Sequence, residues 1–279
     1  MHSMMHVDAD LWAQLMVNLP WSMPDERQRH ILEHLARTGR VLAVDLAKQF
    51  DISEDTARRD LRELAAAGLC QRVYGGALPL STASGTIVQR EGKQTGRKAA
   101  LGRAGAALVA RAMQPREVLF LDAGSTNLAV ARALPPDLHI TVVTNAPHIA
   151  AALASLAGIE LIMIGGRVDA RCGAALGTRA LRDLGAIRID LALLGACAVD
   201  AAAGLAAFDL EDAEFKRAAA QAAAMVATTA TNEKLGTSAP FRIIPAPRLT
   251  HLVVEADAPS ALVEPFQAIG IKTHKAPRP

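Results

Sequence analysis

Six short segments, most of them apolar, recur along the last two thirds of the chain, and stretches with helical periodicity separate most of them. Short apolar segments of this kind are typical of strands that are buried on both faces of a sheet. Their alternation with helices predicts a mostly parallel sheet that is covered by helices. The expected strands are residues 118–121, 140–143, 159–164, 191–194, 225–227 and 252–254. The alanine-rich stretches 201–207 and 218–224 are expected to form a loop and a helix.

Residues 24–78 show a different pattern, that of three short helices and a β-hairpin. Apolar side chains recur at helical spacing in the first two helices, and Ser53 is placed to cap the third. Gly68 ends the third helix, and the pair Gly75 and Gly76 suits a hairpin turn. The expected helices are 25–38, 44–50 and 53–67, and the expected strands are 69–74 and 77–80. The result is a tri-helical unit followed by a β wing.

The third helix of this unit has two distinct faces. Ala57, Leu61 and Leu64 share one face and can pack on the other two helices. The opposite face and its flanks carry arginines, whose forked donors can reach guanine edges or phosphates. Hydroxyl groups near the helix N-terminus can donate to backbone phosphate. The candidate DNA-contacting residues are Ser53, Thr56, Arg58, Arg59 and Arg62 on this helix, with Arg72 and Tyr74 on the wing.

The charge of the unit leaves a protein-interaction module open as an alternative. Residues 24–78 hold nine Lys and Arg and nine Asp and Glu, so the unit is neutral as a whole. Extension of the window to residue 103 gives fourteen basic and ten acidic side chains, a net charge of +4. The following segment therefore has basic residues to offer to DNA.

The chain is long enough for two domains. It has 279 residues, of which 51% are hydrophobic and only 3% aromatic, so the core must be built mainly from Ala, Leu, Val and Ile. We expect an N-terminal extension (1–23), a winged helix-turn-helix domain (24–78), a linker (79–97) and a Rossmann-like α/β domain (98–275). The linker is assigned because it is polar and shows no periodicity. Whether residues 1–23 are native stays open, because Met23 is an alternative start.

Polar clusters follow three successive strands of the expected sheet. Ligands of open α/β sheets bind at the carboxyl ends of the strands. A glycine and hydroxyl groups that lead into a helix provide a cradle for phosphate. The carboxylate at the same turn can accept hydrogen bonds from sugar hydroxyls, and two lysines can complete the pocket. The candidate effector-binding residues are Asp122, Gly124, Ser125, Thr126, Thr144, Asn145, Gly165, Gly166, Lys216 and Lys234.

Two motifs of the N-terminal unit resemble the DeoR family of bacterial regulators. The first is Thr56-x-Arg58-Arg59-Asp60-Leu61 in the third helix, and the second is Arg72-x-x-Gly75-Gly76-Ala77 in the wing. The larger domain resembles the DeoR-type sensor domain, which is related to sugar-phosphate isomerases. The matching positions are Asp122 to Thr126, Thr144 with Asn145, Gly165 with Gly166, Asp212-Ala213-x-x-Lys216, Lys234-x-Gly236, and the basic pair Arg90 and Lys98.

This resemblance implies a function. It implies a repressor of a sugar or carbohydrate catabolism operon that binds double-stranded operator DNA and is released by a small phosphorylated metabolite, a phosphosugar. It implies no enzyme activity, no catalytic residue and no cofactor. A homodimer or homotetramer is expected, because one winged helix covers only a half-site. Repression and activation use the same parts, so both stay open.

Three departures from the family pattern leave the effector open. Cys197 follows Gly195 and Ala196 where the family often has Asn or Asp before Gly, and Thr231-Asn232-Glu233 stands where Asp-Ser-Ser is usual. Asp212 replaces the usual Glu. The alternative to a sensor is a phosphosugar isomerase-like enzyme with an appended winged helix. Its acid–base residues would be sought among Asp122, Asp212 and Lys234.

Several other classes of protein are not indicated. No uncharged apolar run reaches the roughly 18 residues of a membrane span, and the first residues do not form a secretory signal. The three cysteines fit neither a zinc site nor a redox pair, and His30 and His34 lack the adjacent Glu of a zinc-protease motif. We therefore expect a cytoplasmic protein with no metal site and no membrane partner.

Overall fold

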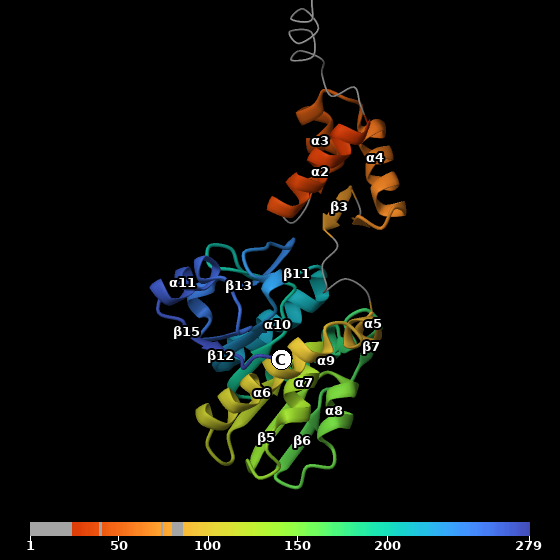
Figure 1. Ribbon diagram of the computed structural model, residues 1–279. Helices are drawn as coiled ribbons and strands as arrows, with labels where there is room; N and C mark the ends of the chain where they lie inside the picture. The colour runs from red at the N-terminus through yellow and green to blue at the C-terminus, as the bar shows by residue number, and fades with distance from the viewer. Residues whose placement is uncertain (1–23, 39–40, 74, 80–85) are drawn as a thin grey trace, which may run out of the picture. The chain divides into compact units, whose positions relative to one another are not determined.

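The computed structural model describes residues 24–38, 41–73, 75–79 and 86–279 (Figure 1). The chain forms two compact units, one that ends at Leu80 and one that begins at Ser81. The expectations for residues 1–23 and for Tyr74 lie outside the described residues.

The first unit is the expected winged helix-turn-helix. It contains α2 (Pro24–Thr38), α3 (Ala43–Phe50) and α4 (Glu54–Ala66). Its strands are β1 (Val41–Leu42), β2 (Cys70–Val73) and β3 (Gly76–Pro79), which form an antiparallel sheet in the order β1-β3-β2. The two-residue strand β1 was not predicted, because two residues show no periodicity. The core side chains include Ile31, Leu35, Leu46, Phe50, Leu61 and Leu64.

The turn between α3 and α4 forms as the sequence predicts. Asp51 adopts a left-handed conformation with φ of 52°, and the Ile52 amide donates to the Ala47 carbonyl at 3.0 Å. Ser53 is the N-cap of α4, and its side chain accepts a hydrogen bond from the Thr56 amide at 3.1 Å. The cap satisfies one of the amides that a helix N-terminus leaves unpaired, so it fixes where α4 begins.

The span assigned to a linker is only in part a linker. The structure places α5 (Ile87–Glu91) within residues 79–97, and α6 (Thr95–Ala112) begins there. Thr86 and Gln89 form a reciprocal capping box, which starts α5 in a segment that shows no periodicity. The side chain of Ile87 is buried.

The second unit is built on a seven-stranded sheet with the order β15-β14-β12-β9-β4-β5-β6, and all its strand pairs are parallel. The six expected strands are all present. The seventh, β15, was missed because its sequence Lys-Thr-His-Lys is polar, as an edge strand allows. The strands are β4 (Val118–Leu121), β5 (Ile140–Thr144), β6 (Ile159–Met163), β9 (Ile189–Leu194), β12 (Ala223–Ala230), β14 (His251–Val254) and β15 (Lys272–Lys275).

Chain order reverses direction between β4 and β9, so the sheet has a topological switch point there. Helices lie beside the strands of the sheet, as Figure 1 shows. The remaining helices are α7 (Ser125–Ala133), α8 (Pro147–Leu153), α9 (Thr178–Gly185), α10 (Leu210–Ala222) and α11 (Ser260–Ala268), with two 3-10 turns (Asn232–Lys234 and Ala246–Arg248). None of the helices in the described residues is long and apolar enough to span a bilayer.

Smaller β elements lie outside the main sheet. A hairpin pairs β7 (Arg167–Asp169) with β8 (Ala174–Leu176), and an antiparallel sheet joins β10 (Ala198–Asp200), β11 (Gly204–Ala207) and β13 (Phe241–Ile244). The expectation of a loop over residues 201–207 was therefore wrong at its end, where β11 is buried. At Gly204, where φ is 86°, a Cβ would lie 2.1 Å from the Ile244 carbonyl oxygen, so only glycine allows the two strands to approach. Residues 218–224 are helical up to Ala222, as predicted.

Candidate functional site

Helix α4 has one anchored face and one exposed face. Ala57, Leu61 and Leu64 are buried in the core of the first unit, as the sequence predicts. The candidate DNA-contacting arginines Arg58, Arg59 and Arg62 are exposed, as is Ser53, while Thr56 is half-buried. On the wing, Arg72 of β2 is exposed. The exposed face has the donors that a recognition helix needs.

Two of the three candidate arginines of α4 pair with acidic side chains of the same helix, while Arg62 donates to the Arg58 carbonyl. Arg58 lies 2.5 Å from Glu54, and Arg59 lies 3.0 Å from Glu63. Exposed pairs one helical turn apart are worth only about 0.3–0.5 kcal/mol, so a phosphate or a base edge can displace the carboxylates at little cost.

Asp60 of the family signature lies on the buried face. Its carboxylate accepts two hydrogen bonds from the Arg27 guanidinium, at 2.5 and 2.9 Å, and both side chains are buried. This hydrogen bond and the charge of Asp60 raise the pKa of Arg27 despite its burial. The pair ties α2 to α4. The sequence analysis missed it, although a carboxylate between Ala57 and Leu64 on an apolar face is a signal for a buried partner.

The second candidate site lies at the switch point of the large sheet. Asp122 follows β4 and is fully buried, and Gly195 follows β9. The Gly195 amide donates to Oδ2 of Asp122 at 2.8 Å. A Cβ on Gly195 would lie 2.6 Å from the Ala123 carbonyl oxygen, so the two strand ends approach closely only because this residue is glycine. Ligands of open α/β sheets bind outside the strand ends at such a point, so we call this place the switch-point crevice.

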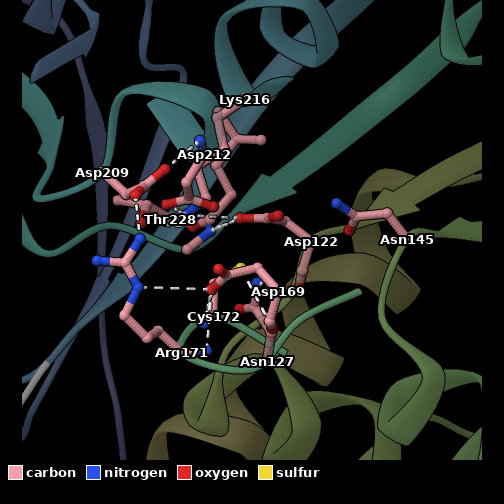
Figure 2. Close-up of polar contacts among 12 residues, drawn as sticks. Asp122, Asn127, Asn145, Asp169, Arg171, Cys172, Asp209, Asp212, Lys216 and Thr228 are labelled. Atoms are coloured by element: carbon pink, nitrogen blue, oxygen red, sulfur yellow. Dashed lines mark hydrogen bonds and ion pairs between the residues drawn. The ribbon is translucent and has the colours of Figure 1, made fainter. Parts of the chain in front are cut away.

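Helix α10 brings a buried ammonium into the switch-point crevice (Figure 2). The Lys216 Nζ lies 3.6 Å from Oδ2 of Asp122 and donates to Asp212 on the preceding turn. Phe215 packs on Phe120 of β4 with ring centroids 6.0 Å apart, which fixes α10 over the strand.

The charges of this group are strongly coupled. Burial raises the pKa of Asp122 to about 6, against the opposing effect of the Lys216 charge. Burial alone would lower the pKa of Lys216, but the carboxylates of Asp122 and Asp212 outweigh it, so the pKa is raised. Lys216 therefore remains an ammonium at neutral pH.

The turn after β4 has the geometry of an anion cradle. Gly124 is the N-cap of α7 with φ of 140°, a conformation that favours glycine, and the space where its Cβ would stand is open. Ser125 and Thr126 form the first turn of α7, whose amides point toward this end of the helix.

The polar residues after β5 are held mainly by local contacts. The Thr144 hydroxyl accepts from the Ala146 amide at 3.2 Å, and the Asn145 amide donates to the Ala175 carbonyl at 3.2 Å. The Oδ1 atom of Asn145 has no hydrogen-bond partner among the described residues. After β6, Gly165 and Gly166 form the turn into β7, and Gly166 has φ of 144°.

Lys234 is half-buried in the 3-10 turn that follows β12, and no ion pair holds it within the described part of the chain. Burial and the positive charges of Arg90, Lys216 and Lys98 lower its pKa to about 8, although Cys197 opposes the shift. The structure thus brings Asp122 and Lys216 into contact and places Lys234 within electrostatic range of Lys216.

Unsatisfied polar atoms gather at this edge of the sheet. They include Oδ1 of Asp122 and Oδ1 of Asn127, which are both buried and have no hydrogen-bond partner in the ranges described. Buried polar atoms are rarely left unpaired, so they point to a polar ligand or solvent at the switch-point crevice. Asn127 was missed by the sequence analysis. Its amide donates to the carbonyls of Asp122 and Leu193 at 2.9 and 3.1 Å and so links β4 to β9.

Metal-binding geometry is not evident in the ranges that the structure describes, where no group of three or more His, Cys, Asp and Glu side chains is placed to hold an ion. His34 instead contacts Gln49 at 3.1 Å, and His30 lies 3.3 Å from Glu33.

A winged helix-turn-helix with arginines on its exposed helix, joined to an α/β domain with a polar crevice at its switch point, defines a ligand-responsive transcription regulator. Comparison with known proteins agrees. Residues 27–83 match the DeoR-like helix-turn-helix domain, and residues 93–256 match the DeoR C terminal sensor domain. The chain belongs to the DeoR family of transcriptional regulators.

Relatives across most of the chain carry names of this class. The chain is 32% identical over 217 residues to the glycerol-3-phosphate regulon repressor of Escherichia coli, covering 77% of this chain and 84% of that one. It is 33% identical over 217 residues to the HTH-type transcriptional regulator GlpR of Haloferax volcanii, covering 77% and 83%. Among solved structures, the sorbitol operon regulator SorC of Klebsiella pneumoniae aligns over 76% of this chain and 91% of its own, with 14% identity and a TM-score of 0.38.

Proposed function

We propose that this protein represses a carbohydrate-catabolism operon and that a phosphorylated sugar in the switch-point crevice weakens its hold on operator DNA. The observation that carries the proposal is the group formed by Asp122, Lys216 and Lys234 at the switch point. Relatives named for glycerol-3-phosphate, aga and iol regulation support the carbohydrate assignment.

On the DNA side, Arg58, Arg59 and Arg62 reach base edges or phosphates, and Ser53 and Thr56 position the start of α4 on the backbone. The wing adds Arg72 from β2. One such unit reads a half-site, so we propose that the protein acts as a homodimer or homotetramer.

On the effector side, the charges divide the crevice into two parts. Lys234 and the amides at the start of α7 suit a phosphate, because both offer unpaired positive donors. Asp122 and Asn145 each have an oxygen without a partner in the described residues, and these acceptors suit the hydroxyl groups of a sugar. We propose no cofactor, because this ligand binding needs none.

The effector must change the operator equilibrium by a definite amount. A shift from almost wholly bound to almost wholly released requires a difference of about 5.5 kcal/mol between the two states. Hydrogen bonds to charged groups contribute roughly 1.5–3 kcal/mol each. Two to four such bonds that form only in the released state therefore supply this difference.

One observation favours an enzyme as the second candidate. A buried carboxyl with a pKa of about 6, as at Asp122, is a usable general base near neutral pH. The neighbouring Lys216 ammonium is held between two carboxylates, where it serves charge balance rather than proton transfer. We therefore place sensing first and propose that the protein is not an enzyme. Turnover of a pentose or hexose phosphate by the purified protein would instead favour the enzyme.

The effector half of the proposal is tested by calorimetry with a panel of sugar phosphates and the matching unphosphorylated sugars. We expect one phosphorylated compound to bind and its unphosphorylated form to bind far more weakly. The Lys234→Gln variant should lose this preference, because it removes an unpaired ammonium without breaking an ion pair. Equal binding of both forms, or no binding by any compound in the panel, would overturn the assignment of the crevice to phosphosugars.

A further inference from the structure

A groove of about 380 Å³ lies between α6 and α7, on the flank of the second unit. Its cationic side chains come from both helices, and an apolar floor lies between them. The lining residues used below are Glu91, Lys98, Arg103, Ser125, Leu128 and Arg132. Lys216 and Lys234 do not line this groove.

The charge of the groove is unbalanced. Lys98, Arg103 and Arg132 face a single carboxylate, that of Glu91. Arg103 and Arg132 are exposed, and neither forms an ion pair within the described residues. By contrast, three other exposed arginines of the same unit form ion pairs. Their partners and N–O distances are Glu255 for Arg97 (2.9 Å), Glu211 for Arg167 (3.4 Å) and Asp209 for Arg171 (2.6 Å).

Two buried groups beside the groove have lowered pKa values, to which nearby positive charges contribute. Lys98 is buried and donates to the Arg90 carbonyl, and burial together with the charge of Arg90 lowers its pKa. Burial also lowers the pKa of His148; the charge of Glu91 opposes this shift, and the charges of Arg90 and Arg132 add to it. The buried atoms Nε of Arg90 and Nε2 of His148 have no hydrogen-bond partner in the part of the chain described. An anion in the groove would stabilise these charges.

The two helices that form the groove pack closely against each other. At Gly102 of α6 a Cβ would lie 2.6 Å from the backbone of Ala129 in α7, so the two helices are in close backbone contact. Leu128 is buried on the side of α7 that faces α6. This contact holds the backbones of α6 and α7 together, so it fixes the spacing between the backbone positions of Arg103 and Arg132.

We propose that this groove is a second ligand site, which binds a small polyanion with at least two negative charges. Arg103 and Arg132 hold the charged groups, and Leu128 contributes to the floor. The groove shares Ser125 with the anion cradle at the start of α7, and the charge of Lys98 reaches Lys234. The proposed site is therefore defined by Arg103 and Arg132, which belong neither to the Lys216 and Lys234 group nor to the recognition helix.

The test is calorimetric titration of the full-length protein with inorganic pyrophosphate, at an ionic strength held constant with NaCl. We expect saturable binding to the wild type that is about tenfold weaker in Arg103→Gln and in Arg132→Gln, and undetectable in the double variant. Both arginines are exposed and form no ion pair within the described residues, so the variants should fold as the wild type does.

Two control variants separate binding in the groove from a general charge effect and from binding in the switch-point crevice. Arg188→Gln removes an exposed arginine that directly precedes β9 and does not line the groove, and it should leave pyrophosphate affinity unchanged. Lys234→Gln should also leave it unchanged. Loss of binding in Lys234→Gln with full binding in the double variant would place the anion in the switch-point crevice and overturn the proposal. Equal affinity in the wild type and the double variant, or no binding by the wild type, would also overturn it.

Discussion

The buried pair of Arg27 and Asp60 gives a prediction whose size follows from the structure. We consider the change Asp60→Ala. The Asp60 carboxylate makes two hydrogen bonds to the guanidinium, at 2.5 and 2.9 Å, and both side chains are less than a tenth exposed. Removal of one partner of a buried ion pair leaves the other charge uncompensated and costs about 3–5 kcal/mol. Because small domains have only about 5–15 kcal/mol of stability, the winged helix-turn-helix should lose much of its own.

The assay is hydrogen exchange of the full-length protein, resolved by peptide. A single melting curve would mix the two units, whereas exchange reports each separately. In Asp60→Ala, amides of α2 and α4 should exchange about 10²–10³-fold faster, since each 1.4 kcal/mol is a factor of ten. Amides of the large sheet should be unchanged and serve as an internal reference.

A double variant separates structure from DNA contact. Arg27→Met with Asp60→Leu replaces the pair by apolar side chains, which is often neutral or stabilising for a buried pair. It should restore both protection and DNA affinity, because Asp60 faces the core. Wild-type protection of α4 in Asp60→Ala would refute the buried pair. Restored protection without DNA binding would show that one of the two residues contacts DNA.

Three further predictions concern the two candidate sites. Arg59→Ala should weaken operator binding by about 1–3 kcal/mol in fluorescence anisotropy at fixed salt, with Arg188→Ala unaffected as the control; equal losses in both variants would show a non-specific charge effect. Lys234→Gln should bind operator DNA as the wild type does but no longer respond to the sugar phosphate that the calorimetric panel identifies; an unchanged response would exclude Lys234 from the crevice. The pKa of Asp122 in the folded protein, about 6, lies above its ordinary 3.8, so the folded state binds this proton first and the group adds stability as pH falls through 6 toward 3.8. Denaturation midpoints of Asp122→Asn should lack that increment, and identical pH profiles would contradict the shifted pKa.

The sequence predicted the large sheet well because its strands are apolar on both faces. Residues 118–121 match β4, and the other five expected strands overlap β5, β6, β9, β12 and β14. The strand β15 has no such signal, because an edge strand of Lys, Thr and His needs little apolar surface. Strands β10 and β11 are short and rich in alanine, which favours a helix, and tertiary pairing overrides that preference.

Part of the site at the switch point could also be predicted from the position of a strand. Asp122 sits directly after a recognisable strand, so its place at the sheet edge follows from the strand alone. Its contact with Lys216 depends on how α10 crosses the switch point, and no local pattern specifies that. The Arg27 and Asp60 pair joins side chains 33 positions apart, which lies outside the range of periodicity arguments.

Release of the operator by the effector is tested by measuring operator affinity with and without the phosphosugar that binds the crevice. The purified protein would be titrated onto DNA from its own upstream region at fixed salt, with fluorescence anisotropy as the readout. We expect sequence-specific binding that the phosphosugar weakens in the wild type, but not in Lys234→Gln. Operator affinity that stays the same at saturating phosphosugar would rule out release by this effector, because a ligand that binds both states equally cannot shift the equilibrium between them.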